Sequence, residues 1–194
     1  MTSIRHNGGP DDSLLDAARE CMLAVGWKRT TLTDVARRAG VSRMTIYRRW
    51  PDMQTLLSDL MAREWSGVVV DSALEVDGSP VARLADSVAR TVRTLRESDL
   101  FRKIVHVDPE LLLPYLLDRR GRTQDSILEM LEAGIAAGQR DGSVRAGDPG
   151  LMARSIMLTA HGFTLSAETM ADTAEGLDRL DAELATLVRR YLTP

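Results

Sequence analysis

The segment 31–50 constrains the fold more than any other part of the chain, because it predicts two short helices joined by a very tight turn. Thr31 and Asp34 have the spacing of a capping box, in which each side chain bonds to the backbone of the other residue at a helix start. Gly40 suits the left-handed position that ends this helix, and Ser42 can cap the next one almost immediately. Two helices with so short a connection form a helix-turn-helix.

Helical periodicity accounts for the rest of the chain as well. Pro51 ends the second short helix, because the residue before a proline avoids helical geometry. The chain contains no alternating strand pattern, and only 4% of its residues are aromatic. We expect an all-α fold of about nine helices, with loops at 71–80 and 142–148. The other helices are expected at about 12–25, 52–70, 80–97, 99–106, 109–118, 122–138, 149–170 and 175–192.

Basic residues are concentrated in one short part of an acidic chain. The formal net charge of the whole chain is −3, yet residues 28–49 hold seven Lys or Arg and one acid, Asp34. Such a concentration is typical of a surface that binds a polyanion, although a solvated helix face would have the same composition. The apolar share of 44% is ordinary for a globular protein.

Several classes of protein are disfavoured by what the sequence lacks. The single cysteine, Cys21, cannot form an internal disulfide, and no apolar run is long enough to span a membrane, so we expect a cytoplasmic protein. His6, His106 and His161 are isolated from one another. No metal-spaced cluster, phosphate-binding glycine loop or nucleophile elbow is present. We therefore expect no catalysis, no metal and no cofactor.

The segment from Thr30 to Asp52 reads TTLTDVARRAGVSRMTIYRRWPD, and this sequence resembles the signature of the TetR family. Gly26, the AGVS turn, Tyr47 and Trp50 stand where that family has them. The close resemblance covers about residues 12–60. It implies an N-terminal three-helix DNA-binding domain at 12–51, after a flexible arm at 1–11. An all-helical body at 52–194 would bind an effector and form the dimer.

The resemblance also implies which residues meet DNA. Arginine can bind guanine through two hydrogen bonds, and a methionine can contact the methyl group of thymine. Arg43 and Arg48 could instead be solvated charges, and Tyr47 and Trp50 could pack in the core. The residues expected to contact bases are Arg43, Met44 and Tyr47, and those expected to contact the DNA backbone are Thr31, Thr33, Thr45, Arg48 and Arg49.

One position departs from the family pattern. Many relatives have a lysine just after the cap of the fourth helix, where it meets phosphate, and this chain has Met53 there. DNA affinity should then depend more on Arg48 and Arg49. The acidic cap Asp52 would be unfavourable near phosphate unless backbone amides satisfy its charge.

The last two predicted helices carry apolar seams with three- and four-residue spacing. Seams of this kind suit a four-helix bundle formed by two chains, although they could also pack inside one chain. The expected dimer residues are Leu151, Ser155, Leu158, Gly162 and Leu165 in the first helix, and Leu177, Leu180, Leu184, Leu187 and Tyr191 in the second.

The body is also expected to contain an effector cavity, because TetR-like proteins have one. Methionine and aromatic side chains with two histidines among them would suit a hydrophobic ligand, but each could equally be ordinary core. The candidate lining residues are Trp65, Phe101, His106, Tyr115, Met130, Met157, His161 and Phe163.

Together these observations predict a homodimeric transcriptional regulator that binds a double-stranded DNA operator. By analogy with the family, we expect a repressor that a small hydrophobic molecule releases from a palindromic operator. The alternative is a DNA-binding regulator without a small-molecule effector, which a protein partner controls or which acts constitutively.

Overall fold

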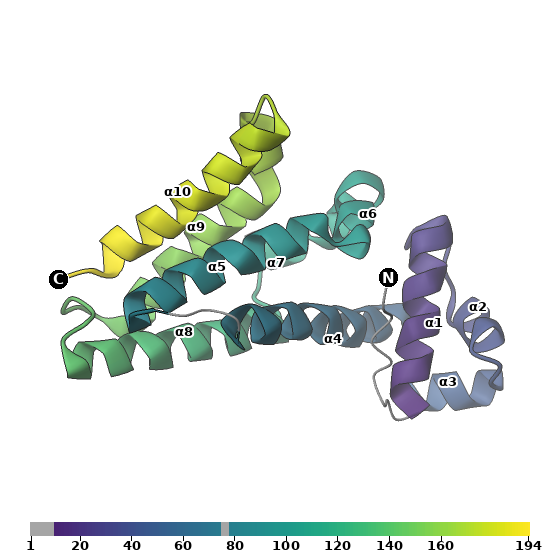
Figure 1. The fold of residues 1–194 in the computed structure, drawn as a ribbon. Helices are drawn as coiled ribbons and strands as arrows, with labels where there is room; N and C mark the ends of the chain where they lie inside the picture. The colour runs from purple at the N-terminus through teal and green to yellow at the C-terminus, as the bar shows by residue number, and fades with distance from the viewer. Residues whose placement is uncertain (1–9, 75–77) are drawn as a thin grey trace. The chain divides into compact units, whose positions relative to one another are not determined.

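The computed structural model describes residues 10–74 and 78–194, and within these residues the structure is helical and contains no strand. Figure 1 labels the helices. The described residues form ten α-helices, of which α7 is little more than one turn, close to the number of about nine that was expected. In chain order the elements are α1 (Pro10–Val25), α2 (Leu32–Arg38), α3 (Arg43–Arg49), α4 (Met53–Leu74), α5 (Pro80–Glu97), α6 (Asp99–Val107), the 3-10 helix η1 (Pro109–Leu111), α7 (Leu113–Leu117), α8 (Arg122–Asp141), α9 (Pro149–Met170) and α10 (Ala174–Leu192).

Two expected boundaries are wrong. The helix α4 continues to Leu74, through the first part of the loop expected at 71–80, because no glycine or proline interrupts it there. Residues 75–77 lie outside the described part of the chain, and α5 then starts after the cap Ser79. At the N-terminus, α1 begins at Pro10 inside the expected arm, since proline is compatible with the first turn of a helix. The rest of that arm, residues 1–9, also lies outside the described part.

The chain packs as two compact units that are not continuous in sequence. The N-terminal unit contains Met1–Glu64 and Asp99–Arg119, and the body unit contains Trp65–Ser98 and Arg120–Pro194. This grouping differs from the linear boundary expected between residues 51 and 52, because α6 packs against α1. Contacts between helices far apart in sequence therefore complete the N-terminal unit.

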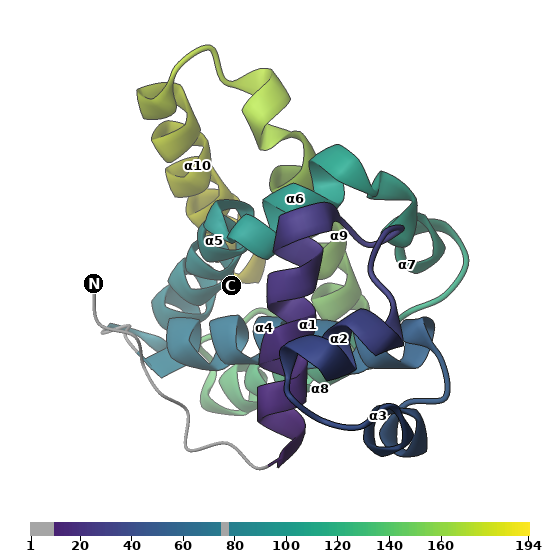
Figure 2. The same ribbon diagram turned by 90° about the vertical axis from the view of Figure 1, so that its right-hand side faces the viewer.

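A small apolar core holds α1, α2 and α3 together in the N-terminal unit, and Figure 2 shows the three helices next to one another. Val35 of α2 and Ile46 of α3 are fully buried, and Ala36 allows the two helices to cross closely. Trp50 is also buried, and its indole Nε1 donates a 2.8 Å hydrogen bond to Asp59. Trp50 is thus a packing residue, which was one of its two expected roles.

The loop between α1 and α2 is held by residues that follow α6. The buried Asp108 carboxylate accepts a 2.7 Å hydrogen bond from the Trp27 backbone N–H. Beside it, Lys28 forms a 2.7 Å ion pair with Glu110. Gly26 has a positive φ of 82°, and a Cβ atom at this position would lie only 3.1 Å from the Asp108 Oδ2 atom. The end of α6 and the entry to the helix-turn-helix are therefore joined by direct bonds.

We expect Asp108→Ala to lower the free energy of unfolding by about 1–3 kcal/mol, because the partly buried Trp27 N–H loses its acceptor. Chemical unfolding of the full chain measures this loss. Glu110→Ala removes only the neighbouring exposed ion pair and should change stability little. Equal effects of the two substitutions would show that this hydrogen bond contributes no more than the exposed ion pair.

The body unit has its own core, in which α5 lies alongside α10, and α9 packs against α5, α8 and α10 (Figure 1). Apolar side chains from all four helices meet there, including Val92, Ile135, Met152 and Leu184. At one end of this core lies a buried ion pair, in which the Arg96 Nη2 atom is 2.8 Å from both carboxylate oxygens of Asp181.

Candidate nucleic-acid interface

The short helix α3 is fixed to the N-terminal unit from one side only. The Ser42 hydroxyl accepts a 3.2 Å hydrogen bond from the Thr45 N–H and so caps the first turn, as predicted. Ile46 is fully buried, and Trp50 packs just beyond the last turn. A helix anchored along one stripe must present its remaining faces to solvent or to a partner.

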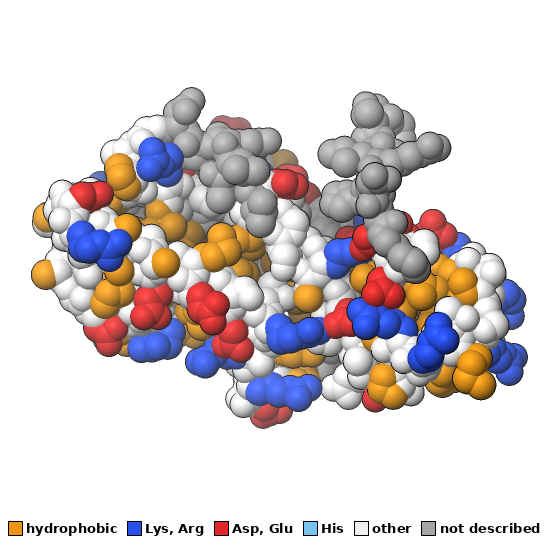
Figure 3. Space-filling model, turned by 90° about the horizontal axis from the view of Figure 1, so that it is seen from below, with side chains coloured by type: hydrophobic (Ala, Val, Ile, Leu, Met, Phe, Trp, Pro, Cys, Tyr) orange, Lys and Arg blue, Asp and Glu red, His pale blue; other side chains and the backbone are white. Residues whose placement is uncertain are grey.

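The outward face of α3 carries the three residues expected to contact bases. Met44 is 76% exposed and Tyr47 is 49% exposed, while Arg43 is also exposed. Tyr47 is therefore not a core residue, which was its alternative role. Large apolar side chains held in water next to a cation are typical of a binding surface. Figure 3 shows basic side chains at the right-hand end of the molecule, where α1 and α3 lie in Figure 1.

The residues expected to contact the DNA backbone differ in how freely they can do so. The Thr31 hydroxyl donates to Asp34 over 2.6 Å, and the Thr45 hydroxyl lies 2.9 Å from the Ser42 hydroxyl. Arg49 forms a 2.8 Å ion pair with Asp11. Arg48 is exposed, and no ion pair engages it within the described residues. Thr33 is partly buried in the first turn of α2.

The predicted capping box at the start of α2 is present in full. The Asp34 N–H donates to the Thr31 hydroxyl, and the Asp34 side chain accepts from the Thr31 backbone. The hydrogen bond from the Thr31 hydroxyl lowers the pKa of Asp34. Asp34 also pairs with Arg37, so its negative charge offsets one of the seven basic residues of this segment.

The acidic cap of α4 is satisfied in the same way. Asp52 accepts hydrogen bonds from the Thr55 backbone N–H at 2.7 Å and from the Thr55 hydroxyl at 2.9 Å. The backbone hydrogen bond lowers the pKa of Asp52. Met53, which stands where many relatives have lysine, is partly buried and brings no charge.

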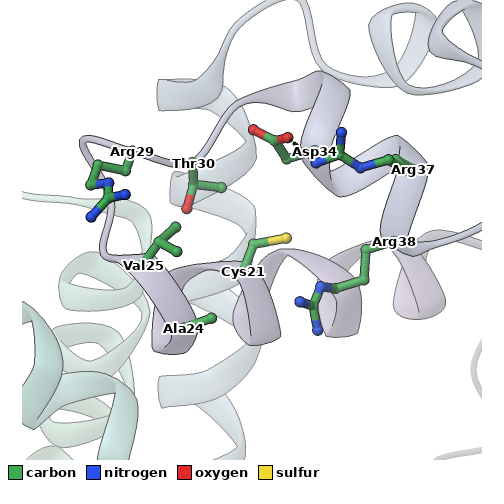
Figure 4. Close-up of a pocket in the computed structure, with 8 residues that line it drawn as sticks. All are labelled: Cys21, Ala24, Val25, Arg29, Thr30, Asp34, Arg37 and Arg38. Carbon is green, nitrogen blue, oxygen red and sulfur yellow. Dashed lines mark hydrogen bonds and ion pairs between the residues drawn. The ribbon is translucent and has the colours of Figure 1, made fainter.

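A hollow of about 390 Å³ lies between α1 and α2, and sequence reasoning did not predict it. Figure 4 shows its lining residues, which are Cys21, Ala24, Val25, Arg29, Thr30, Asp34, Arg37 and Arg38. Burial raises the pKa of the Cys21 thiol, which therefore stays protonated near neutral pH. Arg38 is paired with Glu20 at 3.0 Å. No residue of the expected effector cavity lines this hollow.

The described part of the chain contains neither a cluster of metal-binding side chains nor a membrane-spanning helix. Across residues 10–74 and 78–194, no group of three or more His, Cys, Asp or Glu side chains is arranged to hold a metal ion. Within the same ranges, no helix combines the length and the apolar character needed to cross a bilayer.

Comparison with known proteins agrees with this geometry. Residues 14–60 match the sequence profile of the bacterial regulatory proteins of the tetR family. An uncharacterised HTH-type transcriptional regulator of Mycobacterium bovis is 34% identical over 179 residues, which cover 92% of each chain. The chain belongs to the TetR family. It is therefore a DNA-binding transcriptional regulator.

Solved structures of TetR-family regulators share the fold of this chain. The repressor AlkX from a Dietzia species, implicated in the biodegradation of n-alkanes, superposes with a TM-score of 0.65 at 22% identity and 96% coverage of both chains. The fatty acid degradation regulator FadR from Bacillus halodurans gives 0.67 at 18% identity, covering 95% of this chain and 97% of its own.

The expected cavity residues of this TetR-family chain are divided between its two units. Phe101, His106 and Tyr115 belong to the N-terminal unit, and the other five belong to the body. Phe101 and Met157 are buried. The structure places His106 and Met130 on the surface. The remaining candidates, Trp65, Tyr115, His161 and Phe163, are partly buried.

The expected dimer seams are exposed in part. On α9, Leu158 is 71% exposed, and Leu151 and Gly162 are also exposed. On α10, Leu187 is exposed. The remaining seam residues Ser155, Leu165, Leu177, Leu180 and Tyr191 are partly buried.

The assignment of Leu184 to the dimer seam is wrong. Leu184 is 0% exposed and belongs to the core of the body unit. The inner face of α10, which carries Ala185, Val188 and Leu192, runs next to the predicted seam and includes Leu184. Leu184 belongs both to the predicted dimer seam and to the inner face of α10. In the structure it packs inside the chain.

Proposed function

We propose that this regulator is a homodimeric repressor that binds a palindromic operator and is released from it by a small hydrophobic molecule. The observation that carries the proposal is the exposed face of α3, where Arg43, Met44 and Tyr47 project from a helix anchored by Ile46. A short basic helix held in this way fits the major groove of B-DNA.

Each residue on that face has a distinct role in the proposal. Arg43 binds a guanine edge through its guanidinium group, and Met44 contacts a thymine methyl group. Tyr47 completes the base contacts. The residues that position the domain on phosphates are Thr31, Thr33, Thr45, Arg48 and Arg49. Arg48 is the foremost of these, because no ion pair within the described residues competes for it.

The homodimer is supported by the exposed apolar residues Leu151 and Leu158 on α9 and Leu187 on α10. Exposed leucines along neighbouring helices are costly in water, and a second copy of the chain would cover them. A twofold dimer presents two recognition helices to two half-sites, and this symmetry requires a palindromic operator.

Release by a hydrophobic effector is supported by the apolar candidates of the body, of which Met157 is buried and Phe163 packs against the core. The names of the structural neighbours link AlkX to n-alkane degradation and FadR to fatty acid degradation. An effector shifts DNA binding only if it prefers one conformation of the dimer. A preference of about 100-fold corresponds to about 2.7 kcal/mol of coupling between the two sites.

The proposal is tested by footprinting the protein on the DNA that flanks its own gene, and then by adding apolar compounds to the protected complex. A compound that releases the protein should bind less tightly when saturating operator is present, by the same factor as it weakens DNA binding. An effector whose affinity is unchanged by operator would disprove the coupling. Operator protection that no apolar compound reverses would favour a regulator without a small-molecule effector.

Arg43→Ala should weaken binding to the true operator by about 1–3 kcal/mol and leave binding to random DNA almost unchanged, because the lost contact is to a base. Fluorescence anisotropy with both DNAs measures the two affinities. Arg48→Ala is the matched control, since a phosphate contact is lost equally on both DNAs. Equal losses for Arg43→Ala on the two DNAs would assign Arg43 to the backbone.

A further inference from the structure

A polar pair lies between α8 and α9 within the body unit. The Nε2 atom of Gln124 is 3.5 Å from the Nε2 atom of His161. His161 is one helical turn after the buried Met157 on α9, and it is itself only partly exposed. The pair therefore places hydrogen-bonding groups beside apolar side chains that are candidates for the effector cavity.

The orientation of the Gln124 amide is determined by the start of α8. Its Oε1 atom accepts a 2.8 Å hydrogen bond from the Gly121 backbone N–H. Gln124 is the third residue of the helix, so this is the reciprocal half of a capping box. With the oxygen engaged by the backbone, the NH₂ group of the amide is the end that faces His161.

This orientation selects one form of the histidine ring. An amide NH₂ group is only a donor, so the Nε2 atom of His161 must be the acceptor and carry no proton. In neutral imidazole the proton is then on Nδ1. Burial lowers the pKa of His161, which keeps the ring neutral near pH 7.

The Nδ1–H group is left available to a ligand. Within the described residues, no hydrogen bond engages the Nδ1 atom of His161, and the residue is only partly buried. An apolar ligand with no acceptor would displace the water that bonds to this donor and offer no hydrogen bond in its place. Leaving the donor unpaired in this way costs free energy. A ligand with an acceptor oxygen would satisfy it.

We propose that His161 donates its Nδ1–H to an acceptor oxygen of the effector, and that Gln124 is the positioning residue that holds His161 in the donating form. The effector is then an apolar molecule that carries a carbonyl oxygen, such as a ketone or an ester, and is not a pure hydrocarbon. This inference rests on the proposed ligand-responsive function.

The first test measures the ring directly, without any ligand. The chain has three histidines, so ¹⁵N spectra of histidine-labelled protein can be assigned with a His161→Phe variant. We expect the Nδ1–H form at His161 in the native chain. Gln124→Glu keeps the cap on α8 but presents only acceptor oxygens, so it should move the proton of His161 to Nε2. A native ring protonated on Nε2, or an unchanged ring in Gln124→Glu, would overturn the inference.

The second test compares two probes of similar size, 2-nonanone and nonane, by displacement of an apolar fluorescent dye from the protein. His161→Phe should lower the affinity for 2-nonanone by about tenfold and leave that for nonane unchanged. His161→Asn should restore most of the loss, because its amide N–H lies near the position of the Nδ1–H group. Equal changes for the two probes, or no binding of the ketone, would contradict the inference.

The same probes separate this inference from the proposed function. If 2-nonanone binds in a His161-dependent manner but does not release the operator, the donor site stands and the release mechanism fails. If apolar compounds release the operator equally from the native chain and from His161→Phe, the release mechanism stands and the donor role of His161 is wrong.

Discussion

Leu158→Glu is expected to give a monomeric protein that has lost tight operator binding. Leu158 is 71% exposed in the single chain, so the substitution leaves the core of the body intact. In the proposed dimer, it places a charge inside an apolar interface, where the cost of burying an unpaired carboxylate prevents association. A monomer contacts one half-site, so operator affinity should fall by about 2–5 kcal/mol, half of the usual margin over non-specific DNA.

Sedimentation and operator binding measure the two parts of this expectation together. Leu117→Glu on α7 is the matched control, because Leu117 is as exposed as Leu158 but lies outside the proposed interface. Leu184→Glu would not be informative, since it would damage the core of the body. An intact dimer for Leu158→Glu would show that this face of α9 is not the interface.

Asp181→Ala should lower the free energy of unfolding by about 3–5 kcal/mol, the usual cost of removing one partner from a buried ion pair. Asp181 is 5% exposed and Arg96 is 4% exposed, and their 2.8 Å contacts join α10 to α5. Arg93 also binds Asp181, over 3.0 Å, and this hydrogen bond raises the pKa of Arg93. Without the carboxylate, the Arg96 charge remains buried with no counterion.

Chemical unfolding of the full chain measures the effect, with Asp178→Ala as its control. Asp178 forms an exposed 2.7 Å ion pair with Arg93, so its loss should cost less than about 1 kcal/mol. Replacing Arg96 and Asp181 together by methionine and leucine should recover most of the stability, because no buried charge remains. If the two single substitutions had equal effects, the buried pair would have no special role.

The helix-turn-helix was predictable from the sequence because the signals that define it are local. Thr31 bonds to Asp34 within one turn, and Ser42 caps α3 through the Thr45 N–H. The limits of α3 follow from these signals, because Ser42 lies just before its first residue and Pro51 follows its C-terminal cap, Trp50. The basic charge and the family resemblance are properties of the same short segment.

Local sequence does not determine which apolar face of a long helix packs inside the chain. The tertiary structure decides this. Periodicity shows that a helix has an apolar stripe, but it does not show whether the chain itself or a second copy covers that stripe. Leu184 and Leu187 illustrate this, because they belong to one predicted seam and yet one is in the core and the other on the surface.

Contacts between residues that are far apart in the chain also could not be predicted from the sequence. The Asp108 carboxylate meets the Trp27 N–H across 81 positions of chain, and Asp181 meets Arg96 across 85. Gln124 and His161 are 37 positions apart. No local spacing signals such pairs, because their geometry depends on how whole helices pack, and packing is a cooperative property of the assembled core.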